Sequence, residues 1–236
     1  MNPALKRERT NWRGLPGRLM RSLLARRGSI AAPLGPEWQA DLALIRDTRK
    51  RVALLLNDAA ALQIRIAVRT AARLDGAMAE AGVLMGGSAR LIAEAKGDAL
   101  LYLFDVFDTL QGAAPGGFSS EAEVRGHFGT THGALAMVEA LLSPYPDIRI
   151  RPGVFPSTAS GLGEERFSFV HLDLDLPGAT RDALDFFHPR LVAGGILIGD
   201  DYKDREVREV FTAFFAGKAD TVMPLPWGQV MIVRQG

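Results

Sequence analysis

The sequence predicts an α/β fold, in which a mostly parallel sheet carries helices on both of its faces. From about residue 76 onward, strand-like and helix-like segments alternate along the chain, and this alternation is typical of a parallel sheet with helical crossovers. Apolar residues make up 47% of the 236 residues, which is enough for a sizeable core. This length favours one domain with appendages.

Strand-like segments are expected at residues 77–83, 99–104, 148–151, 167–172, 195–199, 221–225 and 229–233. Apolar runs such as 99–104 and 167–172 are typical of buried strands. Helices are expected where apolar residues recur with helical spacing. They are residues 41–74, 89–95, 133–142, 179–187 and 206–215. Only Pro226, Trp227 and Gly228 separate the last two strands, so we expect these strands to pair antiparallel at one side of the sheet.

A basic N-terminal arm and linker, residues 1–36, precedes the expected domain at residues 37–236. Lysine and arginine are concentrated in residues 1–28, where Glu8 is the only acidic residue. A short helix is expected at residues 18–27, with its apolar side chains on one face. The arm is interpreted as a partly disordered tail, as a helix packed on the domain, or as a segment that binds a membrane surface or a partner.

The composition excludes several classes of protein and site. The formal net charge of +1 predicts no nucleic-acid partner for the chain as a whole. The absence of cysteine excludes disulfides, thiolate metal sites and a cysteine nucleophile, and it fits the cytoplasmic location that we expect. Arginines interrupt the apolar residues near the N-terminus, and no apolar run reaches the roughly 18 residues of a membrane span. We therefore expect no secretion signal and no transmembrane segment.

A glycine turn follows the first expected strand and leads into a helix. It comprises residues 80–88, EAGVLMGGS. Glycines let a ligand approach the backbone, and the start of the next helix offers free N–H donors. Asp105 directly follows the second expected strand and lies 18 residues after Gly87, where an acid suits hydrogen bonds to a ribose diol. Glu80 is placed to meet a cationic amino group. Together these residues favour a site for an adenosine-containing ligand. The alternative is that the glycine turn and the Asp105 carboxylate have only structural roles.

Four aspartates follow two further strands of the predicted sheet. Asp173 and Asp175 come after the apolar run FSFVHL, and Asp200 and Asp201 come after GILIG. Open α/β sheets bind ligands at the carboxyl ends of their strands, and residues two apart in an extended strand face the same side. Hard carboxylate ligands suit Mg²⁺ or Ca²⁺. The sequence therefore predicts a divalent cation site, with helix capping and surface turns as the alternative.

Four stretches of the chain carry a family resemblance. They are AEAGVLMGGSARLIAEA (79–95), LYLFDVFDTLQG (101–112), RIRPGVFPSTA (149–159) and FSFVHLDLDLPGATRDALDFFHPRLVAGGILIGDDY (167–202). They resemble the macrocin O-methyltransferase group of class I S-adenosylmethionine-dependent methyltransferases, which act on sugar hydroxyls of natural products. The resemblance spans about residues 60–235, and the long block with two acidic pairs is its most specific part.

The resemblance implies a class I methyltransferase (Rossmann-like) fold with a seven-stranded sheet and an antiparallel C-terminal strand. The residues that it assigns to the methionine part of S-adenosylmethionine are Glu80, Gly82, Gly86, Gly87 and Ser88, and it assigns Asp105 to the ribose. It implies that Mg²⁺, or another divalent cation, binds to Asp173, Asp200 and Asp201, and that Asp175 is the general base. The family commonly has an aromatic residue where Pro177 stands here, so we expect a different acceptor pocket.

The predicted function is a metal-dependent O-methyltransferase that moves a methyl group from S-adenosylmethionine to a hydroxyl of a small molecule, such as a sugar or another natural product. A non-catalytic S-adenosylmethionine-binding protein is one alternative. An NAD-dependent oxidoreductase is another, although the G-x-G-x-x-G fingerprint is missing.

His171 is expected to be packed in its strand, and His127 and His132 are candidates for contacts with adenine or the acceptor. The sequence does not identify the methyl acceptor. It also leaves the oligomeric state open, and a homo-oligomer is one option.

Overall fold

The structure is a computed structural model that describes residues 15–26, 34–107 and 133–236. Contacts between residues group the chain into two compact units, Met1–Ala40 and Asp41–Gly236. The division of the chain into an arm at residues 1–36 and a domain at residues 37–236 stays a prediction. The first unit contains α2 (Leu15–Arg26) and the short 3-10 helix η1 (Pro36–Trp38). The helix expected in the basic arm is therefore confirmed.

Deleting residues 1–28 is expected to leave the second unit folded, because the buried apolar clusters of the structure consist of residues from that unit. Both the melting temperature and the affinity for S-adenosylmethionine should change little. Thermal unfolding and calorimetric titration of the truncated and full-length chains check this expectation. A large loss of either property would show that the arm contributes to the folded domain or its site.

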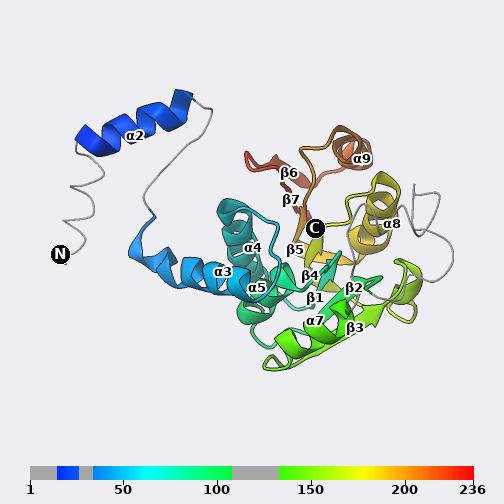
Figure 1. Cartoon of the computed structure of the whole chain (residues 1–236). Helices are drawn as coiled ribbons and strands as arrows, with labels where there is room; N and C mark the ends of the chain where they lie inside the picture. Colours follow the sequence, from blue (N-terminus) through cyan, green and yellow to red (C-terminus); the bar gives the residue numbers. More distant parts are fainter. Residues whose placement is uncertain (1–14, 27–33, 108–132) are drawn as a thin grey trace. The chain divides into compact units, whose positions relative to one another are not determined.

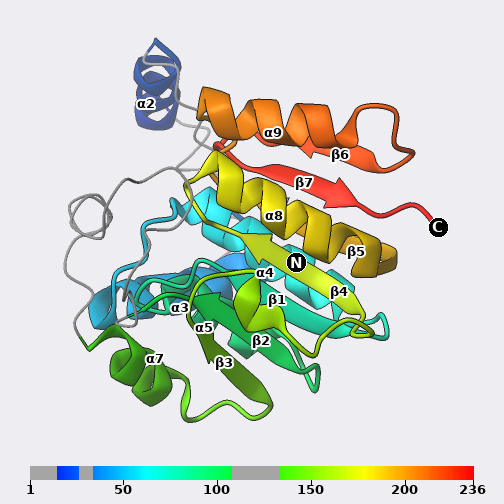
Figure 2. The same cartoon turned by 90° about the vertical axis from the view of Figure 1, so that its right-hand side faces the viewer.

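A seven-stranded sheet lies within the second unit (Figure 1). Its strand order is β3-β2-β1-β4-β5-β7-β6. The strands are β1 (Ala77–Ala81), β2 (Leu101–Asp105), β3 (Ile148–Pro152), β4 (Phe167–Leu172), β5 (Leu191–Gly199), β6 (Thr221–Pro224) and β7 (Val230–Val233). Strands β1 to β5 pair in parallel, and β7 pairs antiparallel with β5 and β6 (Figure 2). These pairings confirm the mostly parallel sheet and the antiparallel C-terminal strand.

Helices cover both faces of the sheet (Figure 1). Each face has its own apolar core. The helices of one face are α8 (Pro177–Phe187) and α9 (Arg205–Phe215), and those of the other are α4 (Asp58–Ala71), α5 (Gly87–Ala95) and α7 (Ala134–Leu142). Val170 and Leu172 of β4 belong to the first core, and Phe169 belongs to the second. This alternation is what a strand buried on both faces requires.

The sequence predicted one continuous helix over residues 41–74. This prediction was wrong, because the structure has two helices there. Helix α3 (Gln39–Arg51) ends before a non-helical segment, residues 52–57, after which α4 begins. Asn57 caps α4, because its side-chain oxygen accepts a hydrogen bond from the Ala60 N–H at 2.9 Å. Asparagine is a favoured N-cap residue, so the sequence did contain the signal for this break.

The parallel strands end in register, which brings the candidate site residues to one edge of the sheet. Ala81 pairs with both Phe104 and Leu172, and Leu172 pairs with Gly199. The residues near or just after these ends are Gly82, Asp105, Asp173 and Asp200. They lie at the carboxyl ends of their strands, as their positions in the sequence predicted.

No helix within the described ranges is long and apolar enough to cross a membrane. The cytoplasmic location and the option of a homo-oligomer stay predictions.

Candidate active site

A cavity of about 460 Å³ lies at the carboxyl edge of the parallel strands, within the range of about 300–1,000 Å³ that is usual for small-molecule sites. Its lining comes from the loops after the five parallel strands and from two further places, residues 53–57 and Trp227. The predicted site residues that line it are Gly82, Gly87, Ser88, Asp105, Asp173, Asp175, Asp200 and Asp201. Glu80 and Gly86 are not among the lining residues.

Close contacts within the protein shape the glycine turn between β1 and α5. Gly82 has a φ of +90°, and a Cβ at this position would lie 1.7 Å from the Asp173 carbonyl oxygen. A Cβ at Gly87 would lie 2.5 Å from the Ala53 carbonyl oxygen. Both glycines are therefore required because other backbone passes close to them, a reason different from the predicted approach of a ligand. Gly86, with a φ of +82°, is the N-cap of α5.

Asp105 holds the same turn through hydrogen bonds that its place in the sequence did not predict. Its Oδ2 accepts from the backbone N–H groups of Val83 at 2.6 Å and Leu84 at 2.8 Å, and its Oδ1 accepts from the N–H of Phe107 at 2.9 Å. Leu84 and Phe107 have positive φ angles of 50° and 45°. Strained non-glycine backbone of this kind clusters at functional sites, where surrounding contacts hold it in place.

Glu80 is fully buried and pairs with His171, which lies opposite it on the neighbouring strand β4. Glu80 Oε1 is 2.8 Å from His171 Nδ1. Burial lowers the pKa of His171, but the hydrogen bond and charge of Glu80, together with nearby aspartates, outweigh burial and raise that pKa to about 9. His171 is thus packed in its strand, as expected. The assignment of Glu80 to the cofactor's amino group stays a prediction, since this side chain is outside the cavity lining.

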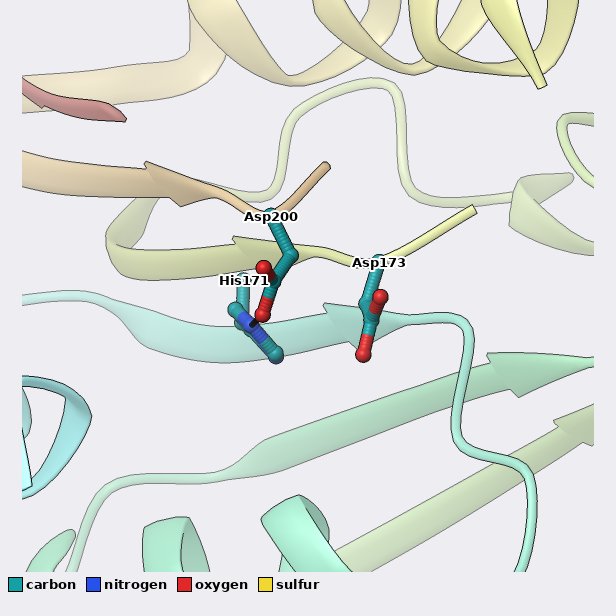
Figure 3. A group of neighbouring side chains, drawn as sticks. All are labelled: His171, Asp173 and Asp200. Atoms are coloured by element: carbon teal, nitrogen blue, oxygen red, sulfur yellow. Dashed lines mark ion pairs between the residues drawn. The ribbon is translucent and has the colours of Figure 1, made fainter. Parts of the chain in front are cut away.

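The four aspartates at the ends of β4 and β5, here called the acidic cluster, take part in two overlapping groups of ligand atoms. One group is His171, Asp173 and Asp200 (Figure 3), and the other is Asp173, Asp175 and Asp201. Within each group the ligand atoms lie within 4.8 Å of one another. The predicted cation ligands are therefore divided between two groups that share Asp173.

Burial and mutual repulsion disfavour the ionised forms of two carboxyl groups in the acidic cluster. Burial raises the pKa of Asp173 well above its usual range, and the other aspartates add to this rise although His171 opposes it. Burial also raises the pKa of Asp201 to about 7, with Asp175 as the next cause. Lys203 Nζ is 3.9 Å from Asp201 Oδ1, but the lysine side chain is largely exposed, so solvent screens its charge. A cation between the carboxylates would favour their ionised forms.

Asp175 reaches the acidic cluster through a tight turn and not through an extended strand. Strand β4 ends at Leu172, Asp175 has a φ of +57°, and the Leu176 N–H donates to the Leu174 carbonyl oxygen at 2.6 Å. The argument from strand alternation was therefore wrong about the backbone. The structure nevertheless places the carboxylates of Asp173 and Asp175 in one group.

Pro177 is accounted for by helix geometry. It is the first residue of α8, a position where proline's fixed φ and missing N–H are well tolerated. Leu176 and Ala179, on either side of it, line the cavity. Proline at this position, where the family commonly has an aromatic residue, therefore leaves α8 and the acidic cluster intact.

Trp227 and Gln229 belong to the site although sequence reasoning did not assign them. Trp227 Nε1 donates to Gln229 Oε1 at 3.1 Å, and Gln229 Nε2 donates to Asp200 Oδ2 at 3.3 Å. Asn57 Nδ2 donates to the Trp227 carbonyl oxygen at 3.3 Å, which joins the start of α4 to the loop between β6 and β7. A tryptophan in a three-residue connection was the available signal, but its partners depend on the fold. His127 and His132 lie outside the described residues.

The chain is similar to known O-methyltransferases. A family model described as Macrocin-O-methyltransferase (TylF) matches residues 58–227. The chain is 33% identical over 138 residues to the 8-demethyl-8-(2,3-dimethoxy-alpha-L-rhamnosyl)-tetracenomycin-C 4'-O-methyltransferase of Streptomyces olivaceus, a match that covers 54% of this chain and 53% of that protein. It is 38% identical over 73 residues to the mycinamicin III 3''-O-methyltransferase of Micromonospora griseorubida, a match that covers 29% of each. The chain thus spans about half the length of the first relative and less of the second.

Solved methyltransferase structures share the fold. The structure of the O-methyltransferase NovP has a TM-score of 0.63 at 21% identity and covers 75% of this chain and 79% of its own. An O-methyltransferase from Bacillus cereus in complex with SAH has a TM-score of 0.59 at 12% identity, with coverages of 91% and 97%. These likenesses confirm the predicted class I methyltransferase fold. Because the family model matches well over half of the residues, this chain belongs to the macrocin O-methyltransferase family.

Proposed function

We propose that this chain is an S-adenosylmethionine-dependent O-methyltransferase that methylates a hydroxyl of a small molecule, a natural-product sugar in the first instance, with a divalent cation at the acidic cluster. The observation that carries the proposal is one cavity, lined both by the glycine turn with Asp105 and by the acidic cluster. Family membership supports the reaction class. The name of the Streptomyces olivaceus relative, which contains a rhamnosyl group, supports a sugar acceptor.

The cofactor is assigned to the part of the cavity formed by the glycine turn. When bound, S-adenosylmethionine supplies the electrophilic methyl group. Gly87 and Ser88 begin α5 and line the cavity, so their backbone N–H groups are free to bind the carboxylate of the methionine part. Asp105 would accept hydrogen bonds from the ribose while it holds the turn through Val83 and Leu84. A solved neighbour in complex with SAH supports the choice of cofactor.

The cation is assigned to the acidic cluster, whose residues fit such a group. The ligands offered are carboxylate oxygens, which divalent cations such as Mg²⁺ prefer. Asp201 Oδ2 is buried and has no hydrogen-bond partner among the described residues. When bound, a divalent cation lowers the pKa of a hydroxyl that it coordinates.

The remaining chemistry is proton transfer and alignment by residues of the chain itself. Asp175 lines the cavity and would take the proton of the acceptor hydroxyl as general base. Gln229 holds Asp200 through its amide group, which keeps that carboxylate oriented. The lining from Leu54 to Leu56 and Trp227 is largely apolar and would exclude water around the acceptor. This mechanism requires no covalent bond between the enzyme and the methyl group.

Replacing Asp105 by Asn is expected to raise the dissociation constant for S-adenosylmethionine by about 10- to 100-fold, in line with roughly 1.5–3 kcal/mol for a hydrogen bond to a charged group. The carboxylate would be lost both for the ribose and for the N–H groups of the turn. Calorimetric titration measures the change. Asp98→Asn is the matched control, because Asp98 is exposed and precedes β2 at the opposite end of that strand. Unchanged affinity in a folded Asp105→Asn variant would remove Asp105 from the cofactor site.

Binding experiments separate this proposal from an oxidoreductase. The chain should bind S-adenosylmethionine and its demethylated product, and it should not bind NAD, because it lacks the dinucleotide fingerprint. Isothermal titration with each ligand tests this directly. Binding of NAD in preference to S-adenosylmethionine would overturn the proposed function.

A further inference from the structure

One nitrogen of the buried pair between β1 and β4 has no role in the mechanism above. His171 Nε2 is buried, has no hydrogen-bond partner among the described residues, and lies 4.0 Å from Asp200 Oδ2. Figure 3 shows the ring beside the Asp200 carboxylate, with Asp173 on the neighbouring strand end. Burial of a polar nitrogen without a partner at hydrogen-bond distance costs free energy, and the ion pair with Asp200 at 4.0 Å is too long to be a hydrogen bond.

The other nitrogen of the ring is fixed by a carboxylate. His171 Nδ1 is 2.8 Å from Glu80 Oε1, and both side chains are fully buried. Histidines that bind metal ions in proteins almost always donate their second ring N–H to a carboxylate or carbonyl, which sets the tautomer and the ring orientation. Glu80 therefore holds the ring so that Nε2 is presented toward Asp200 and Asp173.

We propose that His171 Nε2 is a direct ligand of the divalent cation, together with Asp173 and Asp200, and that Glu80 is the positioning residue of this histidine. The proposal rests on the cation site of the proposed function. Ligand atoms about 2.1 Å from one ion lie within roughly 4 Å of each other, and the His171–Asp200 separation of 4.0 Å already meets this limit. Any proton on Nε2 is released to solvent when the ion binds, while Nδ1–H stays with Glu80.

This assignment divides the acidic cluster by role. The ion would lie where the two groups share Asp173, with His171 and Asp200 from one group and Asp201 from the other as ligands, and Asp175 would stay free to act as base. An imidazole ligand adds a nitrogen donor to the site, whereas Mg²⁺ and Ca²⁺ prefer oxygen donors. We therefore expect Mn²⁺ to bind more tightly than Mg²⁺, and both ions fall within the prediction of Mg²⁺ or another divalent cation.

The test uses Mn²⁺ bound to the full-length chain without acceptor. Pulsed electron paramagnetic resonance should detect coupling between Mn²⁺ and a ¹⁴N nucleus, and titration should give the dissociation constant. In His171→Asn the coupling should vanish and the dissociation constant should rise at least about 10-fold. Asparagine keeps an N–H for Glu80 but lacks the Nε2 position. Glu80→Gln should weaken Mn²⁺ binding by about 10- to 100-fold and keep the coupling.

His188→Asn is the matched control. His188 is also buried and bonded to a carboxylate, with Nε2 2.8 Å from Asp220 Oδ2, but it precedes β5 at the opposite end from Asp200. This variant should bind Mn²⁺ with unchanged coupling and affinity.

Mn²⁺ that binds the native chain without ¹⁴N coupling would overturn the ligand assignment, and this result does not depend on whether His171→Asn folds. Weaker binding in His171→Asn without coupling in the native chain would make His171 a positioning residue for Asp200 and would also overturn it. No binding of any divalent cation would contradict the cation site of the proposed function itself, which is a different result.

Discussion

Asn in place of Asp175 is expected to lower the rate of methyl transfer by about 10²–10⁴, the usual contribution of a general base. Asparagine keeps the shape of the side chain but cannot accept the acceptor's proton. Because Asp175 is assigned to the proton and not to the ion, affinities for the cofactor and for Mg²⁺ or Mn²⁺ should stay close to those of the native chain. Higher pH should restore part of the rate, since the hydroxyl then ionises with less help.

Asp173→Asn is the comparison that separates the two aspartates. Asp173 belongs to both groups of ligand atoms, so losing its charge should weaken cation binding, and excess cation should restore part of the rate. Titrating the cation while measuring turnover in both variants decides the roles. Loss of cation binding in Asp175→Asn with normal binding in Asp173→Asn would reverse the assignment. Normal rates and binding in both would make the acidic cluster structural.

The largest effect on stability is expected for Gly82→Ala. A Cβ at this position would lie 1.7 Å from the carbonyl oxygen and 2.6 Å from the carbonyl carbon of Asp173, and the φ of +90° disfavours a side chain. Steric overlap and backbone strain each cost about 1–3 kcal/mol, so we expect a loss of about 2–6 kcal/mol in the free energy of unfolding. Urea unfolding of the native and variant chains measures this loss.

Gly97→Ala is the control for the backbone contribution. Gly97 also has a positive φ, of +61°, but a Cβ at this position would meet no described atom within 4 Å. Strain alone should then cost about 1–2 kcal/mol. If Gly82→Ala is no more destabilising than Gly97→Ala, the close passage of the Asp173 backbone over the turn does not constrain Gly82.

The sequence predicted the sheet and the location of the site because both depend on local patterns. Apolar runs marked the central strands β1, β2, β4 and β5, and the residues near their carboxyl ends had to share one edge once those strands ran parallel. The break between α3 and α4 was not predicted, because apolar residues continue with helical spacing across it. The local signal for the break is the N-cap residue Asn57.

Contacts between distant residues could not be predicted in this way. Glu80 was assigned to a ligand because it precedes the glycine turn, yet its partner in the structure is His171, 91 positions along the chain. That pairing depends on the register of β1 against β4, which the sequence pattern does not contain. The link from Trp227 through Gln229 to Asp200 likewise requires the antiparallel placement of β7 beside β5.

Methyl transfer itself tests the central claim most directly. The measurement is mass spectrometry of rhamnosylated natural-product acceptors after incubation with the chain, a divalent cation and S-adenosylmethionine labelled in its methyl group. The account predicts a labelled methyl on a sugar hydroxyl, lost when a chelator removes the cation and strongly reduced in Asp175→Asn. Transfer that is unaffected by both the chelator and this substitution, or the absence of transfer to any hydroxyl acceptor by a chain that binds the cofactor, would contradict it.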